Sequence, residues 1–212
     1  MRLEARELSF RYENGGRQIL NHVDFLAESG ERVGIMVPSG YGKTTLCKIL
    51  AGYEKPDSGE VFLDGRPIGE YGGYCPVQMI WQHPELSVNP RSRLYTVLSE
   101  GDWPEEGPEL RKRIVTGLGI EEEWLSRYPS EVSGGELQRF CIARALGKRT
   151  EILLADEITT MLDLITQGII WDFLLKETKR RNMGLVAVSH SEELLEKICT
   201  RIVYLEEAGK TQ

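Results

Sequence analysis

The sequence contains no apolar run long enough to cross a bilayer. Its longest apolar stretches are ILLA (152–155) and GLVAV (184–188), whereas a membrane-spanning helix needs about 20 apolar residues. The start, MRLEARELSF, is charged and has no apolar core of the secretory kind. The formal net charge is −7, so the basic excess typical of nucleic-acid-binding proteins is missing as well. We therefore expect a protein that neither spans a membrane nor binds nucleic acid.

Cysteines are few and widely separated. The four residues, Cys47, Cys75, Cys141 and Cys199, form no C-x-x-C pair. This spacing argues against a zinc site or a disulfide framework and is typical of a reduced cytosolic protein. We expect four buried free thiols.

The order of strand and helix patterns predicts a single α/β domain, which is what 212 residues can form. The first forty residues are predicted as strands and turns. Residues 84–149 contain five prolines and acidic helical pieces, which indicates a mostly helical insertion. From residue 150, apolar strands alternate with helices, which favours a largely parallel sheet. These later elements are expected at 152–156, 164–181, 184–189, 191–199 and 201–205.

The stretch VPSGYGKTT (37–45) approximates a phosphate-binding loop. Gly42, Lys43 and Thr44 supply the second half of G-x-x-x-x-G-K-[ST], but Val37 stands where the first glycine is usual. A strand precedes the loop and a helix follows it, so its N–H groups can surround phosphates while Lys43 bridges phosphate oxygens. A plain strand-to-helix turn remains the alternative. The expected ATP contacts are Val37, Pro38, Ser39, Gly40, Tyr41, Gly42, Lys43, Thr44 and Thr45.

Two carboxylates follow an apolar strand in ILLADE (152–157). Asp156 at the strand end can hold Mg²⁺ through water, and Glu157 can polarise an attacking water. A strand followed by an acidic turn is also common in proteins without such a site.

A second anion-binding element is indicated by VSGGELQR (132–139), which precedes a helix with apolar residues at four-residue spacing. Ser133 suits the N-cap, and Gly134 and Gly135 leave backbone donors uncovered at the helix N-terminus. The presence of two phosphate-binding elements in one chain requires an explanation.

Together these motifs resemble the ATP-binding cassette (ABC) ATPase family, and the resemblance covers nearly the whole chain. In that family the SGGE element, here Ser133, Gly134, Gly135 and Glu136, completes the ATP site of a facing subunit. Tyr12 resembles the aromatic residue that stacks on adenine, and Gln82 the Q-loop glutamine that contacts Mg²⁺ and the water. Asp163 in TTMLD resembles the end of the D-loop, and His190 in AVSHS the switch histidine that contacts the γ-phosphate.

The resemblance implies a P-loop NTPase (RecA-like) core with an N-terminal antiparallel β subdomain and an inserted α-helical subdomain. Residues 1–83 and 150–212 would form the core, and residues 84–149 the helical signature subdomain. The implied cofactors are ATP and Mg²⁺, with Thr44, Gln82 and Asp156 at the metal and Glu157, His190 and Gln82 in catalysis. Two chains, identical or different, would sandwich two ATP molecules.

Two short segments look like the nickel and di- or oligopeptide importer branch of the family. They are SVNPR (87–91) and YPSE (128–131); a generic proline turn is the alternative for the first. The branch implies a separate membrane permease, a solute-binding protein and a location at the cytoplasmic face of the membrane. A soluble ATPase in DNA repair or translation, and a weakly hydrolysing regulatory cassette, remain alternatives.

Four departures from the family pattern accompany the matching motifs. Val37 replaces glycine, Ile158 replaces the usual proline, Thr160-Met161 replaces Ser-Ala, and Ser191 stands where aspartate is common. None of them removes a group that the implied chemistry uses. The D-loop changes allow a slow or asymmetric site.

Overall fold

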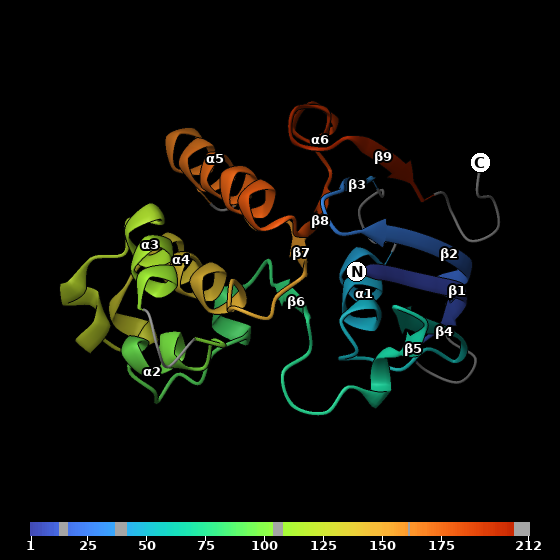
Figure 1. Cartoon of the computed structure of the whole chain (residues 1–212), viewed down its shortest axis with the longest axis horizontal. Coiled ribbons are helices and arrows are strands. Elements are labelled where there is room, and N and C mark those ends of the chain that lie inside the picture. The colour runs from blue at the N-terminus through green and yellow to red at the C-terminus, as the bar shows by residue number, and fades with distance from the viewer. Residues whose placement is uncertain (13–16, 37–41, 104–107, 161, 206–212) are drawn as a thin grey trace.

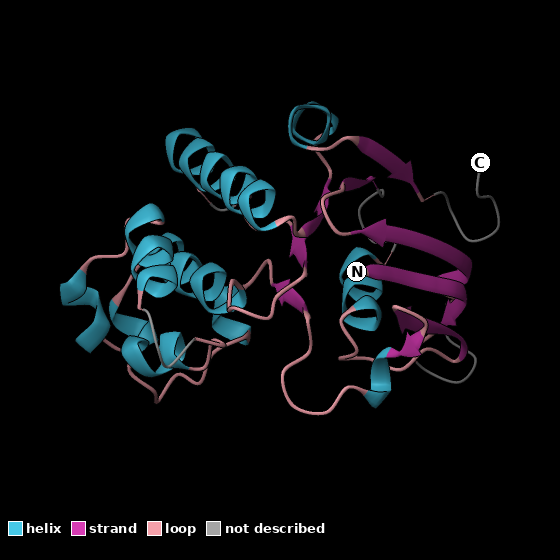
Figure 2. Cartoon of the chain, viewed as in Figure 1, coloured by secondary structure: helices cyan, strands magenta, loops and turns pink. Residues whose placement is uncertain are grey.

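The computed structural model describes residues 1–12, 17–36, 42–103, 108–160 and 162–205. Figure 1 shows a β-rich part and a helical part on either side of a central sheet, and Figure 2 separates helices from strands by colour. The predicted α/β fold with an antiparallel and a parallel sheet is confirmed.

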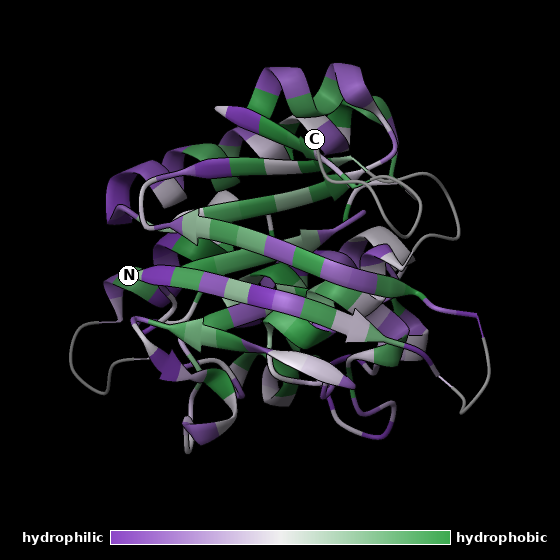
Figure 3. Ribbon diagram, turned by 90° about the vertical axis from the view of Figure 1, so that its right-hand side faces the viewer, coloured by the Kyte–Doolittle hydropathy of each residue, from purple (hydrophilic) through white to green (hydrophobic). Residues whose placement is uncertain are grey.

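The antiparallel sheet has the strand order β2-β1-β4-β5. Along β2 buried and exposed residues largely alternate, because successive side chains of a strand point to opposite faces. Figure 3 shows hydrophilic and hydrophobic residues alternating along these strands. The buried face of this sheet packs against one face of the parallel sheet. The strands are β1 (Arg2–Phe10), β2 (Leu20–Glu28), β4 (Ser58–Leu63) and β5 (Arg66–Pro67).

The central sheet is parallel and has the order β6-β7-β8-β3-β9. Every residue of β7 and β8 is buried, as expected for parallel strands covered on both faces. The carboxyl ends lie together, since Met36 pairs with Ser189 and Asp156 with Val188. The strands are β6 (Val77–Ile80), β7 (Ile152–Asp156), β8 (Gly184–Ser189), β3 (Arg32–Met36) and β9 (Arg201–Tyr204).

Two apolar clusters cover the two faces of the parallel sheet. Ile152 and Leu154 of β7 face α1 (Lys43–Leu50) and the antiparallel sheet. Leu153 and Ala155, which alternate with them, face the cluster built from the remaining helices. These include α4 (Gly134–Ala145), α5 (Leu164–Arg181) and α6 (Glu192–Ile198).

Between β6 and β7 the described elements are all helical. α4 carries Leu137, Cys141 and Ala145 on its buried side, as their four-residue spacing predicts. The other elements are η2 (Pro84–Leu86), α2 (Leu94–Ser99), α3 (Glu109–Gly117), η3 (Glu122–Ser126) and η4 (Pro129–Glu131).

Two expectations need correction. β6 was not expected as a strand, because its four residues give too short a pattern to separate from a loop. The four cysteines are free, but only Cys47 and Cys141 are buried. Cys75 and Cys199 are half-buried, so burial of all four thiols was wrong for two of them.

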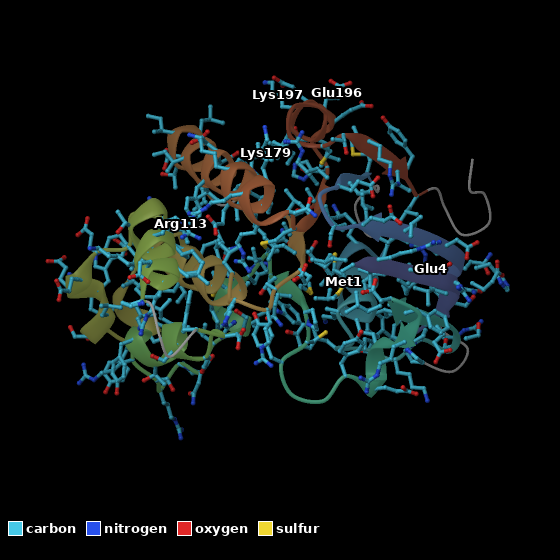
Figure 4. All side chains as sticks on the ribbon, in the orientation of Figure 1. Met1, Glu4, Arg113, Lys179, Glu196 and Lys197 are labelled. Carbon is cyan, nitrogen blue, oxygen red and sulfur yellow. The ribbon has the colours of Figure 1, made fainter. Side chains whose placement is uncertain are left out.

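Helix α5 joins the helical segment to the core through two arginines. Arg113 of α3 forms a two-pronged ion pair with the buried Glu177 of α5, and Figure 4 shows Arg113 on the helix that faces α5. The guanidinium of Arg181 donates to carbonyls in the turn after α4, at 2.6–3.1 Å. One of these carbonyls belongs to Leu146, the C-cap of α4, and the others belong to Gly147, Lys148 and Thr150 in the turn that follows.

We expect Arg181→Met to lower the free energy of unfolding by about 2–4 kcal/mol, because it strands several partly buried carbonyls. Urea unfolding followed by circular dichroism measures this. The exposed neighbour Arg180 is the matched control, and Arg180→Met should change the value by less than about 0.5 kcal/mol. Equal losses for the two variants would contradict the role assigned to Arg181.

Candidate active site

The described part of the phosphate-binding loop begins at Gly42, directly before α1. Its φ is 79°, a backbone conformation that favours glycine. A Cβ at this position would also lie 2.3 Å from Cγ2 of Ile19. Glycine is therefore required at position 42 both by its backbone and by its surroundings. Five residues expected to contact ATP lie outside the described residues: Val37, Pro38, Ser39, Gly40 and Tyr41.

Glu157 lies at the centre of a polar cluster at the carboxyl edge of the sheet. Its Oε1 atom forms an ion pair with the ammonium of Lys43, at the first turn of α1. The amide nitrogen of Gln82 donates to Oε2 at 3.0 Å. Nδ1 of His190 lies 3.5 Å from Oε1. Residues that are far apart in the sequence thus meet at one carboxylate.

Asp156 and Thr44 form a second polar pair beside the first. The Thr44 hydroxyl donates to Oδ2 of Asp156 at 2.6 Å. Burial raises the pKa of Asp156, while the hydrogen bond from Thr44 lowers it. The other oxygen, Oδ1, is buried and has no hydrogen-bond partner among the described residues. A buried carboxylate oxygen of this kind next to a hydroxyl is a suitable ligand set for a hard divalent cation.

Tyr12 reaches the same site from the end of β1. Its hydroxyl shares a hydrogen bond of 2.7 Å with the hydroxyl of Thr45. Its ring packs edge-on against Phe10, with 5.0 Å between the ring centroids. The side chain is otherwise exposed, so an aromatic surface is held beside α1 and stays accessible to a planar ligand.

Except for Asp156, the site residues named above line one open cavity of about 510 Å³. The lining residues are Tyr12, Ile19, Gly42, Lys43, Thr44, Thr45, Gln82, Glu157 and His190. Ile19 was not identified from the sequence, because it belongs to no motif. It lies at the cavity because its backbone N–H donates to the carbonyl of Phe10, next to β2.

Ser133, Gly134, Gly135, Glu136 and Asp163 do not line this cavity. Ser133 caps α4 as expected, accepting from the N–H of Glu136, while the Glu136 carboxylate accepts from the N–H of Ser133. Asp163 caps α5 and accepts from the N–H groups of Ile165 and Thr166. A hydrogen bond from the Thr166 hydroxyl lowers the pKa of Asp163.

The two capped helix starts lie side by side. A Cβ on Gly135 would approach Cδ2 of Leu162 to 2.8 Å, so the SGGE element and the D-loop are adjacent. Ser133, Gly134 and Asp163 are exposed. Together they form an outward-facing surface rather than a wall of the cavity of Lys43.

Gln138 lies in the VSGGELQR motif, but sequence reasoning assigned it no role. It is buried on α4 and donates to the carbonyl of Trp81 at 3.0 Å. Trp81 directly precedes Gln82, so α4 and the segment that carries Gln82 are joined. No sequence motif gave a signal for this contact, which depends on how α4 packs against β6.

The arrangement suits a ligand with several phosphates. The N-terminus of α1 and Lys43 provide positive charge for phosphate oxygens. The pair of Thr44 and Asp156 suits a cation that neutralises the same phosphates. Glu157 can accept a proton from a water molecule. Binding at the carboxyl ends of parallel strands is also the general location of ligands in such sheets.

Comparisons with known proteins agree with this site. The family model described as ABC transporter matches residues 20–160. The nickel import ATP-binding protein NikE of Rhodospirillum rubrum is 32% identical, over 95% of this chain and 77% of the relative. A nickel import system ATP-binding protein NikE of Staphylococcus aureus is 31% identical, over 97% and 87%.

A solved structure is similar over nearly its full length. It is the dimeric post-hydrolysis state of the ATP-binding cassette MJ0796 bound to ADP and Pi, with a TM-score of 0.83 and 27% identity. The match covers 99% of this chain and 97% of that one. With its phosphate-binding helix start, its carboxylate pair and the family match over most of its length, the chain belongs to the ABC transporter family, as an ATP-binding and ATP-hydrolysing subunit.

Proposed function

We propose that this chain is the ATPase subunit of an importer that takes up a small solute through a separate membrane permease. The observation that carries the proposal is the meeting of Lys43, Gln82, Glu157 and His190 at one cavity. The relatives named as nickel import proteins make nickel the favoured solute. A peptide is the second candidate, because SVNPR and YPSE look like both importer groups.

In the proposed reaction, the chain positions ATP and neutralises its charge. Lys43 and the start of α1 hold the phosphates, and the ring of Tyr12 stacks on the adenine. Thr44, Asp156 and Gln82 would hold Mg²⁺, which neutralises charge on the phosphates; the unpaired Oδ1 of Asp156 supports this assignment.

The attack of water on the γ-phosphate depends on the side chains around the reacting phosphorus. Glu157 accepts the proton of the water, and His190 contacts the γ-phosphate. Gln82 orients the water through the same amide group that now donates to Glu157. Positioning of this kind supplies most of the rate in phosphoryl transfer.

A second ATPase subunit completes each site in this proposal. Ser133, Gly134 and Asp163 are exposed and lie outside the cavity, with the half-buried Gly135 and Glu136 beside them. From there the backbone donors of a facing chain reach the ATP held by Lys43. The dimeric form of the similar cassette structure supports this arrangement. The partner is an identical chain or a related one.

The permease contact is assigned to a groove of about 430 Å³ between the core and the helical segment. Tyr53 and Trp81 lie on its core side and Arg144 on its helical side. The ring centroids of Tyr53 and Trp81 lie 5.8 Å apart, and Tyr53 is 56% exposed. An aromatic groove with one arginine is typical of a protein interface. Permease loops that insert there would contact Trp81, which directly precedes Gln82, and would thereby be coupled to the ATP site.

The remaining parts of the assembly follow from this role. In the described part of the chain no helix is long and apolar enough to cross a membrane. We place the subunit at the cytoplasmic face of the membrane, attached through the permease. A solute-binding protein would deliver the solute on the other side. The proposal assigns no nucleic-acid partner.

We expect Tyr53→Asp to weaken capture of the co-expressed permease about tenfold, because it puts a charge into the aromatic groove. Co-purification from detergent extracts measures capture, and the basal ATPase rate of the isolated subunit should be retained. Tyr204, 51% exposed on the opposite edge strand β9, is the matched control. If the wild-type subunit is recovered with ribosomes or nucleoid and no permease, the transport proposal is wrong.

A further inference from the structure

The ion pair between Glu157 and Lys43 engages two groups that the proposed reaction needs separately. Lys43 is the cation for the phosphates, and Glu157 is the base for the water. The side chains are 12% and 9% exposed, so the pair is largely shielded from solvent. Shielding strengthens such a contact relative to a surface pair.

The backbone of Glu157 is adapted to this contact. Its φ is 48°, in the left-handed region that residues with a side chain rarely adopt. Its N–H donates to the carbonyl of Val188, and its carboxylate receives Lys43 and Gln82 at separate oxygens. Residues held in such conformations occur often at functional and switching sites.

The neighbouring contacts follow the same pattern. Each consecutive side chain at the start of α1 is engaged by a group of the chain itself: Lys43 by Glu157, Thr44 by Asp156 and Thr45 by Tyr12. Of these, only the contact of Lys43 joins opposite charges. A phosphate and the Glu157 carboxylate are both anions with oxygen acceptors, so they require the same position on the ammonium.

We propose that Glu157 is an internal competitor of the nucleotide: its carboxylate holds Lys43 until a phosphate displaces it. This inference rests on the proposed function, because it assigns a regulatory contact to the same site. Displacement has a second consequence. Glu157 then loses its ion pair with Lys43 and remains beside Gln82 and His190, where it can polarise water. Phosphate binding thus releases the base at the moment when a substrate is present.

The test compares two variants at position 157 by calorimetry with ADP. Glu157→Gln removes the charge. Glu157→Asp keeps the charge but is one methylene shorter, so its carboxylate does not reach Lys43 in the same geometry. We expect both variants to bind ADP about tenfold more tightly than the wild type. Adenosine, which has no phosphate for Lys43, should bind all three proteins equally.

Other outcomes separate the competing explanations. If Glu157→Asp binds ADP like the wild type while Glu157→Gln binds more tightly, general charge repulsion explains the effect and the competitor role is wrong. Unchanged ADP affinity in both variants also overturns it. If the wild type hydrolyses ATP although one of these two outcomes is found, the proposed ATPase function holds and only the competitor role of Glu157 is wrong. A wild-type protein that binds neither ADP nor adenosine would instead contradict the proposed function.

Discussion

Lys43→Ala should weaken ATP binding by at least about a hundredfold, which in a calorimeter means no measurable heat of binding at micromolar protein concentration. The ammonium lies at the first turn of α1 and lines the cavity. No other lysine or arginine among the described residues lines this cavity. The loss should therefore not be compensated by another side chain.

Lys48 provides the control for this variant. It lies on the same helix, but its ammonium is placed over the ring of Trp81 at 5.3 Å and does not line the cavity. Lys48→Ala should leave ATP affinity within about twofold of the wild type. Similar affinities for Lys43→Ala and the wild type would refute the assignment of the phosphate-binding loop.

Glu157→Gln should lower the rate of ATP hydrolysis by about 10²–10⁴-fold, because the amide is a much weaker proton acceptor than the carboxylate. ATP binding should be retained. With hydrolysis blocked, ATP keeps the facing subunits together, so the variant should elute as a dimer on a sizing column with ATP. Phosphate release and elution volume measure the two effects.

Glu151 is the matched control, since it directly precedes β7 at the end opposite to Glu157. Glu151→Gln should hydrolyse ATP at the wild-type rate and show no trapped dimer. Monomeric elution of Glu157→Gln with bound ATP would count against the two-subunit site. A wild-type rate in that variant would show that another group acts as the base.

Local sequence patterns predicted much of this fold, because they report properties that do not depend on distant residues. The apolar runs at 152–156 and 184–189 are strands buried on both faces. Ser133 is the predicted N-cap of α4, and the structure adds Glu136, three residues later, as its reciprocal partner. The element missed, β6, is four residues long and receives its order from pairing with β7 rather than from its own pattern.

The site divides in the same way. The sequence by itself determined the α/β class, the start of α1 at Lys43 and the strand-end position of Asp156 and Glu157, since these follow from local period and turn chemistry. The family resemblance implied that Tyr12, Gln82, Glu157 and His190 share the ATP site. Only the tertiary structure decided that Lys43, Gln82 and His190 meet at the carboxylate of Glu157, and that Ile19 completes the cavity. It also placed Glu157 in a left-handed conformation against Lys43. The physical reason is that strand order and register are set by long-range pairing, which no local pattern encodes.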